Sequence, residues 1–438
     1  MALPIFGKRS DILSKLLIKN IELLNTPNGE LYNIAIEDKK IAYVGGDVPA
    51  GFEAAEVVDG KGMLATAGMV NTHGHVSMTI LRSYADDMAL MDWLENKIWP
   101  IEAKMDAKDI YWGAMLGIVE MIKSGTTCFA DMYCFMEDVA KACVETGMRA
   151  NLCRGLIGVA PDADVKLAEN DVLAENWQGA GEGLIRVSYG PHAPYTCPVP
   201  YLEKVIKAAA DHKAEIQMHL CETKFEVESY AKEHGITPIK MMDNLGMFDL
   251  GTIAAHAVHL TDEDMEIMAA KKVRVAHNPQ SNLKLASGIA PVAKMLEKGI
   301  CVGLGTDGAS SNNNLDMLEE CRAAAMLHKA TTFDPLVVPA AKAWEMATVD
   351  GAKVLGFEGL GKLEAGQLAD IVLWDTHKPY WFPRHNKLSQ LVYAANSSDV
   401  DTVIINGKKV LEAGKLLTFD EEKIYAEAQA CAERLVKK

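Results

Sequence analysis

Histidines stand at the ends of several short apolar segments of this 438-residue sequence. Two of them, His73 and His75, form a His-Gly-His motif, and residues i and i+2 of an extended chain point to the same side. Both imidazole rings can therefore reach one point, and neutral imidazole is a good ligand for zinc or iron. Taken alone, the motif also fits two unrelated polar loop residues, so a metal site needs further ligands.

Two such ligands are available, because His219 and Asp307 also close apolar segments. Three imidazole nitrogens and one carboxylate oxygen leave room for water, which is the pattern of a catalytic metal site and not of a closed structural one. Asp307 lies in the sequence GLGTDG, where it would also suit an ordinary turn beside glycine. Its convergence with the histidines favours the role of a ligand.

Glu222 and His256 follow two of the same segments and are candidates for moving protons. Glu222 lies in HLCET, where it is either an acid at a helix N-terminus or a proton shuttle beside a metal. His256 and His259 are three residues apart, so they face opposite sides of an extended segment. We expect His256 to point into the site and His259 to hold the loop that follows.

The remaining histidines fall into two groups. His192 and His277 also end apolar segments, which places them near the same site without giving His277 a defined role. Five others lie in predicted helices and loops, where we expect solvated surface groups: His212, His234, His328, His377 and His385.

The sequence favours one metal ion over two. The segment IRVSYGPHAPY has no lysine that could be carboxylated to bridge a second metal. The H-x-E and P-C-x-x-C pair of cytidine-deaminase-type zinc sites is also absent.

A scaffold that brings these residues together can be predicted from the middle of the chain. Between about residues 66 and 365, short apolar segments alternate with amphipathic helical stretches. Eight strand-then-helix units predict an α/β fold, a TIM-like (β/α)8 barrel, in which active sites lie at the C-terminal ends of the strands. The eight segments are the run into Val70 and residues 126–133, 149–158, 185–192, 215–222, 252–260, 274–279 and 301–308.

The two ends of the chain have a different pattern. Residues 16–25, 31–38 and 39–46 alternate apolar and polar side chains between glycine-rich turns, and residues 368–376 and 400–417 do the same. Chain termini often lie close together. We therefore expect residues 1–65 and 366–438 to form one small discontinuous β-sandwich domain beside a barrel of residues 66–365.

The composition limits partners and location. Lys and Arg total 44 against 60 Asp and Glu, a formal charge of −16, which argues against nucleic acid as a partner. Hydrophobic residues make up 49% of the chain, enough for a large core, and we expect the 22 methionines to fill it. No run of about 18 apolar residues predicts a membrane span, and the first 20 residues lack the apolar segment of a signal peptide.

The nine cysteines also bear on location. Their number is odd and no C-x-x-C pair occurs. We therefore expect neither a disulfide framework nor a cysteine zinc site. We also expect a cytoplasmic location.

Several motifs together resemble those of the amidohydrolase superfamily: GMVNTHGH, GPHAPYTCP, MHLCET, AAHAVHL, HNPQSNLKLASG and GTDGASSNNNLDM. More narrowly, they are similar to the 5-methylthioadenosine/S-adenosylhomocysteine deaminase branch. The likeness extends over nearly the whole chain, including KLEAGQLADIVLWD near its end. Guanine deaminases and triazine hydrolases share much of the pattern.

This resemblance implies a metal centre and its chemistry. One divalent metal per subunit, Zn²⁺ or alternatively Fe²⁺, would be bound by the residues that match the family's ligands: His73, His75, His219 and Asp307. Glu222 matches the acid that protonates the purine ring nitrogen. His256 matches the histidine that holds the attacking water, which Asp307 also orients.

The resemblance also implies substrate contacts. Glu102 matches the acid that binds the ribose hydroxyls, and Trp93 the aromatic ring beside the sugar and its sulfur substituent. Arg154, His192 and Ser311 match further binding positions. Without the resemblance, Trp93 would be assigned to the core and Glu102 to a solvated helix face. The family's second arginine has no counterpart in IGVAPDADVKLAEN, which leaves the preferred 5′-substituent open.

The expected reaction is hydrolytic removal of the 6-amino group of adenine nucleosides such as S-adenosylhomocysteine and 5′-methylthioadenosine, with adenosine or 5′-deoxyadenosine as further candidates. The products would be the inosine analogue and ammonia, and the enzyme is expected to be a homo-oligomer that acts on small molecules. Other amidohydrolase reactions, such as guanine deamination or triazine dechlorination, are alternatives. A non-catalytic barrel that serves as a scaffold is the alternative of another class.

Overall fold

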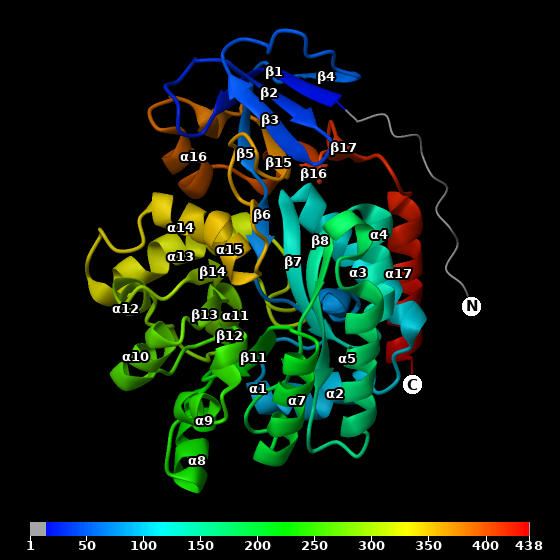
Figure 1. The fold of residues 1–438 in the computed structure, drawn as a ribbon, viewed down its shortest axis with the longest axis vertical. Coiled ribbons are helices and arrows are strands. Elements are labelled where there is room, and N and C mark those ends of the chain that lie inside the picture. The colour runs from blue at the N-terminus through cyan, green and yellow to red at the C-terminus, as the bar shows by residue number, and fades with distance from the viewer. Residues whose placement is uncertain (1–14, 438) are drawn as a thin grey trace.

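The computed structural model describes residues 15–437. The expectation that the chain does not open with a signal peptide rests mostly on residues 1–14, which lie outside the described residues. Figure 1 shows the chain as two layers, a β-rich part at the top of the view and an α/β part below it.

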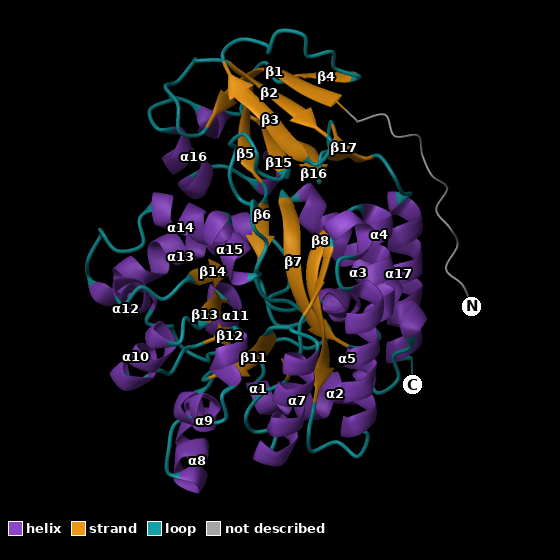
Figure 2. Ribbon diagram, in the orientation of Figure 1, coloured by secondary structure: helices purple, strands orange, loops and turns teal. Residues whose placement is uncertain are grey.

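Two parallel sheets form the α/β part (Figure 2). The first contains β6 (Met69–Asn71), β7 (Thr126–Tyr133), β8 (Arg149–Leu156), β9 (Ile185–Val187) and β10 (Gly190–Pro191). The second contains β11 (Ile216–Leu220), β12 (Thr252–His256), β13 (Arg274–His277) and β14 (Val302–Leu304). Each of the eight predicted segments contains a strand, so the α/β class is confirmed.

Backbone hydrogen bonds join the two sheets at both edges. The N–H of Thr72, just after β6, donates to the carbonyl of Leu304 in β14 at 2.8 Å. On the other side, the N–H of Tyr189 donates to the carbonyl of Glu215 at 2.9 Å. These contacts are consistent with the predicted (β/α)8 barrel, in which each strand edge meets a neighbour.

Helices follow the strands and cover the outside of the sheets (Figure 1). Between β6 and β7 lie η1 (Val76–Leu81), α1 (Leu90–Trp93), the π-helical η2 (Leu94–Ile98), α2 (Trp99–Glu102) and α3 (Ala107–Lys123). After β7 to β10 come α4 (Met136–Thr146), α5 (Ala163–Trp177), α6 (Ala180–Gly183) and α7 (Val199–Asp211). After β11 come α8 (Lys224–His234), α9 (Pro238–Asn244) and η3 (Met247–Leu250).

The last strands are followed by α10 (Asp262–Ala270), α11 (Pro279–Lys284), α12 (Val292–Glu297), α13 (Met317–Thr332), α14 (Ala340–Ala347) and α15 (Val349–Val354).

Local sequence explains where two of the helices begin. Asp106 with Asp109, and Thr261 with Asp264, form capping boxes that satisfy N–H groups at the start of α3 and α10.

Both ends of the chain contribute to one β-sheet. Its N-terminal strands are β1 (Lys15–Leu23), β2 (Tyr32–Glu37), β3 (Lys40–Gly45), β4 (Glu56–Asp59) and β5 (Met63–Ala67). Its C-terminal strands are β15 (Ile371–Asp375), β16 (Val400–Ile405), β17 (Lys408–Glu412) and β18 (Lys415–Leu416). The two groups meet where β5 pairs antiparallel with β15, and β1 pairs with both β2 and β5.

The C-terminal segment also contains helices that leave this sheet. They are η4 (Pro379–Trp381), α16 (Lys387–Tyr393), η5 (Ser397–Asp399) and α17 (Glu421–Val436). The last helix, α17, packs against α3 of the α/β part, as the red helix in Figure 1 shows.

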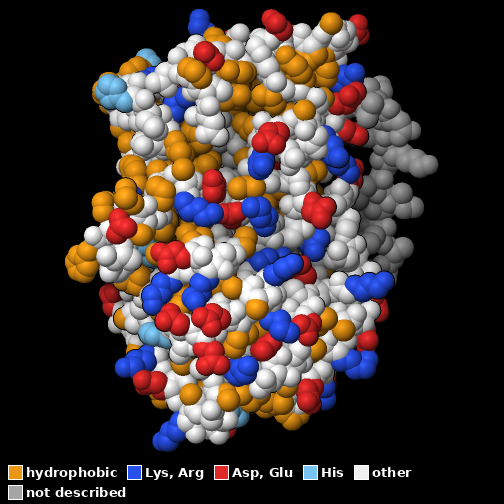
Figure 3. All heavy atoms as spheres, turned by 60° about the vertical axis from the view of Figure 1, so that its left-hand side comes forward, with side chains coloured by type: hydrophobic (Ala, Val, Ile, Leu, Met, Phe, Trp, Pro, Cys, Tyr) orange, Lys and Arg blue, Asp and Glu red, His pale blue; other side chains and the backbone are white. Residues whose placement is uncertain are grey.

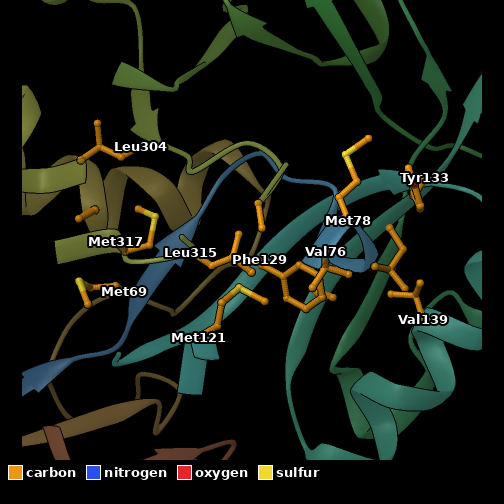
Figure 4. Close-up of a cluster of buried hydrophobic side chains, with 14 of the residues drawn as sticks. Met69, Val76, Met78, Met121, Phe129, Tyr133, Val139, Leu304, Leu315 and Met317 are labelled. Carbon is orange, nitrogen blue, oxygen red and sulfur yellow. The ribbon is translucent and has the colours of Figure 1, made fainter. Parts of the chain in front are cut away.

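Hydrophobic clusters fill both parts, and the larger one continues from the α/β part onto strands β15, β16 and β17. Ile18, Ile34 and Ile371 belong to a cluster inside the β-rich part. The larger cluster lies between the parallel strands and their helices, where Figure 4 labels Met69, Met78, Met121 and Met317 among the buried side chains. These methionines fill the core, as the composition predicted.

A buried ion pair connects the two parts. The guanidinium of Arg149, at the start of β8, donates two hydrogen bonds of 3.0 Å to the carboxylate of Asp370, just before β15. The side chains of Arg149 and Asp370 are 2% and 0% exposed. Asn406 accepts a further hydrogen bond from Arg149, so the buried charges have partners on several sides.

Side chains of both charges lie on the surface (Figure 3), and the cysteines are unpaired. In the view of Figure 3, cationic and anionic side chains are interspersed. Within residues 15–437, no helix has both the length and the apolar character needed to cross a bilayer. All nine cysteines are free in the structure.

Candidate metal centre and the cavity around it

Three histidine rings and one carboxylate converge at the C-terminal ends of the parallel strands. The Nε2 atoms of His75 and His219 are 3.4 Å apart, although the residues are separated by 144 positions. One oxygen of Asp307 lies 3.5 Å from Nε2 of His73 and 3.3 Å from Nε2 of His75. His73, His75 and His219 form one group that could hold a metal ion, and His73, His256 and Asp307 form another.

Hydrogen bonds on the far side of the rings aim these nitrogens at one another. The Nδ1 atom of His75 lies 2.7 Å from the carbonyl oxygen of Met132, and Nδ1 of His219 lies 2.7 Å from that of His192. A carbonyl only accepts, so each Nδ1 carries a proton and each Nε2 is the ring atom that faces the cluster. Within residues 15–437, the buried Nε2 of His73 finds no hydrogen-bond partner. A divalent metal ion bound here would satisfy these nitrogens.

The two oxygens of Asp307 have different surroundings. The hydroxyls of Ser281 and Ser311 donate to Oδ2 at 2.6 and 3.0 Å. Oδ1 instead faces the histidines. Because two hydroxyls occupy Oδ2, the carboxylate is fixed with Oδ1 turned toward the candidate metal position.

Backbone geometry brings the two ends of this cluster together. The N–H of Asp307 donates to the carbonyl of His73 at 3.0 Å. A Cβ on Gly305 would lie only 2.8 Å from the backbone nitrogen of His73, so glycine permits this close approach. Asp307 and His256 adopt φ values of 62° and 72°, and strained residues of this kind often gather at functional sites.

The electrostatics of the cluster favour a cation. Burial lowers the pKa of His73 to about 4. Burial also acts to lower the pKa of His75, but the carboxylate of Asp307 outweighs it and raises that pKa to about 9. The buried carboxylate of Asp307 thus provides a negative charge directed at neighbouring ring nitrogens, which is the donor set of a catalytic zinc-type site.

Glu222 and His256 lie beside this cluster. Nε2 of His256 is 3.8 Å from a carboxylate oxygen of Glu222. Nδ1 of His256 is 2.8 Å from the amide oxygen of Asn282, so Nε2 is the ring atom available to the site. The hydroxyl of Ser287 donates to Glu222 at 3.2 Å. Burial raises the pKa of Glu222, so this carboxyl retains its proton to a higher pH than an exposed acid would.

A cavity of about 460 Å³ opens above the cluster. Apolar side chains such as Met78, Leu90, Trp99 and Ile157 form much of its wall. The predicted residues that line it are His75, Trp93, Glu102, Arg154, His192, His219, Glu222, His256, Asp307 and Ser311. This volume is in the range of small-molecule sites, which combine apolar walls with a few polar groups.

The predicted substrate-binding residues have defined partners in this cavity. The carboxylate of Glu102 accepts a hydrogen bond of 2.6 Å from the hydroxyl of Tyr133. Arg154 donates to Glu169 at 2.7 Å and to the carbonyl of Tyr133 at 3.2 Å. Ser311 lines the cavity while its hydroxyl bonds Asp307, so its structural partner is a predicted metal ligand.

Of the histidines expected at the surface, His234, His377 and His385 are exposed, and His212 is half-buried beside Tyr189. His259, expected to hold the loop that follows it, bonds the carbonyl of Ser287 at 2.7 Å, 28 positions further along the chain. The expectation that His328 is a surface group is wrong, because it is 2% exposed and its Nε2 lies 3.1 Å from Nε2 of His277. The helix α13 turns His328 inward to give buried His277 a partner, as buried polar groups require.

Sequence reasoning missed the residues that orient the others. Ser281 and Asn282 lie in the quoted motif HNPQSNLKLASG, yet only the structure shows that they bond Asp307 and His256. Glu226 lies four residues after Glu222, and this spacing in an acidic motif was a signal that could have identified it. Tyr133 ends a predicted strand, which was the same signal that identified the histidines.

Comparison with known proteins places this geometry in a family. The model of the amidohydrolase family matches residues 64–410. A 5-methylthioadenosine/S-adenosylhomocysteine deaminase from Desulforamulus reducens is 51% identical over 433 residues, which cover 97% of this chain and 100% of that protein. The protein of the same name from Pelotomaculum thermopropionicum is 54% identical over 405 residues, 92% of this chain and 94% of the relative.

Comparison with solved structures also finds proteins with the same fold. An adenosine deaminase from Xanthomonas campestris with bound zinc superposes with a TM-score of 0.90 at 33% identity, covering 96% of this chain and 98% of that one. A triazine hydrolase, at 24% identity and a TM-score of 0.88, shares the fold. The chain belongs to the amidohydrolase family, and within it to the group of relatives named 5-methylthioadenosine/S-adenosylhomocysteine deaminases.

Proposed function

We propose that the chain is a metal-dependent hydrolase that removes the 6-amino group of adenine nucleosides. S-adenosylhomocysteine and 5′-methylthioadenosine are the first candidate substrates, because the relatives at about half identity carry that name. The products are the inosine analogue and ammonia. The observation that carries the proposal is the convergence of four metal-type donors, an acid and a further histidine on one cavity.

The proposed metal ligands are His73, His75, His219 and Asp307, with one Zn²⁺ per subunit. Bound zinc in the Xanthomonas campestris structure and the nitrogen-rich donor set support zinc over other divalent ions. A cation held there supplies Lewis acidity, which allows a water molecule to lose its proton near neutral pH.

The remaining steps are assigned to side chains of the chain itself. His256 and Asp307 orient the attacking water, since the side chains of both lie at the cluster. Asp307 accepts a proton of this water and passes it to the amino group, which leaves C6 as ammonia. Glu222 donates a proton to N1 of the purine, which stabilises the charge that develops as C6 is attacked. A positioned general acid of this kind contributes about 10²–10⁴-fold to the rate.

Substrate selection is assigned to the outer cavity. Glu102 accepts hydrogen bonds from the ribose hydroxyls, Trp93 packs beside the sugar, and His192 and Ser311 contact the base side of the ligand. Arg154 and Lys166 line the cavity as cations, each paired with an acid, Glu169 and Asp162 respectively. The outer end of the cavity therefore carries charges of both signs. Such charges favour a 5′-substituent that carries an amino acid, which has an ammonium and a carboxylate, as in S-adenosylhomocysteine.

The proposed organisation follows the chain's pattern. We assign residues 66–365 to a closed (β/α)8 barrel, and residues 1–65 and 366–438 to a small β-sandwich whose last helix, α17, returns to the barrel. Free cysteines support a cytoplasmic location. Assembly as a homo-oligomer, with small molecules and not nucleic acid as ligands, completes the proposal.

Ammonia release from a substrate panel tests the function. The zinc-loaded protein is assayed with S-adenosylhomocysteine, 5′-methylthioadenosine, adenosine, 5′-deoxyadenosine, guanine and a chlorinated triazine. Turnover of the adenine nucleosides, lowered at least 10²-fold by Glu222→Gln with metal retained, is the expected result. Preferred turnover of guanine or the triazine, or a Glu222→Gln variant as active as the wild type, would contradict it.

A further inference from the structure

Tyr133 connects two parts of the cavity that come from distant segments. It ends strand β7, and the residue is 8% exposed. Its hydroxyl donates to Oε1 of Glu102, 31 positions earlier on α2, at 2.6 Å. Both residues line the cavity, so this hydrogen bond joins the barrel to the helical segment that covers the cavity.

This hydrogen bond alone orients the Glu102 carboxylate. Among residues 15–437, no other hydrogen bond or ion pair to the Glu102 side chain occurs in the structure. A glutamate side chain has three rotatable bonds, so without this donor the carboxylate could turn to several positions. Because Tyr133 engages Oε1, Oε2 is left as the atom with free acceptor capacity.

The end of β7 holds neighbouring groups as well. The carbonyl of Met132 accepts from His75 at 2.7 Å, and the carbonyl of Tyr133 accepts from Arg154 at 3.2 Å. Met132 and Tyr133 therefore hydrogen-bond three groups of the site. These are the candidate metal ligand His75, the candidate sugar-binding acid Glu102 and the cation Arg154 at the outer end. A donor fixed on a strand places Glu102 more accurately than the short helix α2 could.

We propose that Tyr133 is a positioning residue that determines selectivity for ribosides. Its hydroxyl holds the Glu102 carboxylate where the ribose 2′- and 3′-hydroxyls can donate to it, and so the enzyme favours nucleosides that carry an intact diol. The inference rests on the proposed function and adds to it a residue that acts on substrate through Glu102.

The test compares two substrates in a Tyr133→Phe variant. Tyr133→Phe removes only the hydroxyl, and a hydrogen bond to a charged group is worth about tenfold or more in binding. We expect the ratio of kcat/KM for 5′-methylthioadenosine over 2′,3′-dideoxyadenosine to fall about tenfold, mainly through a higher KM for the diol substrate. Bound zinc per subunit, measured in parallel, should equal that of the wild type.

Two further variants separate positioning from a general structural effect. Tyr195→Phe changes another tyrosine of the cavity whose hydroxyl makes no hydrogen bond to Glu102, and it should leave the substrate ratio unchanged. The double variant Tyr133→Phe/Glu102→Ala should show the same ratio as Glu102→Ala alone, because the hydroxyl acts through that carboxylate.

The outcomes are distinguishable. An equal loss on both substrates in Tyr133→Phe, or an additive loss in the double variant, would overturn the role of Tyr133 while the proposed deamination stands. If the wild type deaminates neither compound, the proposed function fails and this role fails with it.

Discussion

The carboxylate of Glu226 holds the turn that presents Glu222 to the cavity. Its two oxygens accept from the backbone N–H groups of Cys221 and Glu222, each at 2.9 Å. Cys221 has a φ of 55°, so this turn is strained as well as buried. A buried acid thus satisfies the two N–H groups of the turn that carries Glu222.

Glu226→Gln should lower kcat by about tenfold to 100-fold, because an amide can accept only one of the two N–H groups and small misplacements of a catalytic acid are costly. Metal content should be preserved, since His219 is held separately by the carbonyl of His192. Steady-state kinetics and metal analysis check both. Glu228→Gln, exposed on the same helix, is the matched control, and an equal effect of both variants would contradict this role.

Asp370→Asn should destabilise the folded protein by about 3–5 kcal/mol, because it leaves the guanidinium of Arg149 buried without a counter-charge. Denaturant unfolding measures the loss. Asp211→Asn, which breaks the exposed pair with Lys207, should cost no more than about 1 kcal/mol. Equal losses in the two variants would show that the buried pair is not what joins the two parts.

Cys134 should react slowly with iodoacetamide although it lines the cavity. Burial raises the pKa of its thiol to about 12, so at pH 8 only about one molecule in 10⁴ carries the reactive thiolate. Its alkylation rate should rise about tenfold per pH unit from pH 7 to 9.5. Mass spectrometry of the Cys134 peptide gives the rate, and a plateau near pH 9, as in the urea-unfolded chain, would refute the raised pKa.

Lys166→Met should lower kcat/KM for S-adenosylhomocysteine about tenfold and that for 5′-methylthioadenosine less than twofold. Only the first substrate carries a carboxylate that the ammonium at the cavity wall can pair with. Parallel assays of the two nucleosides test this. The same loss on both would mean that Lys166 shapes the cavity without recognising the 5′-substituent.

The strands and the convergence of candidate ligands could be predicted from sequence because each signal is local. A polar residue at the end of an apolar segment marks the strand end, and parallel strands bring those ends together, as His75 and His219 show. Their roles as ligands stay predictions. The orienting partners were not predictable in this way, since Tyr133 and Glu102, or Ser281 and Asp307, meet only through side-chain rotamers and loop positions.

His328 also shows where prediction from sequence fails, because a residue expected at the surface is buried. Its place in a helical stretch predicted a solvated ring, yet a helix position does not tell which face meets the core. The partner that decides its orientation, His277, is 51 positions away.

The central claim is that His73, His75, His219 and Asp307 bind one metal ion. A crystal structure of the zinc-loaded protein, with anomalous data on both sides of the zinc edge, measures this directly. We expect one zinc peak per subunit at about 2.0–2.2 Å from the three Nε2 atoms and Oδ1 of Asp307. No peak at this position, or zinc bound by other residues, would contradict the account.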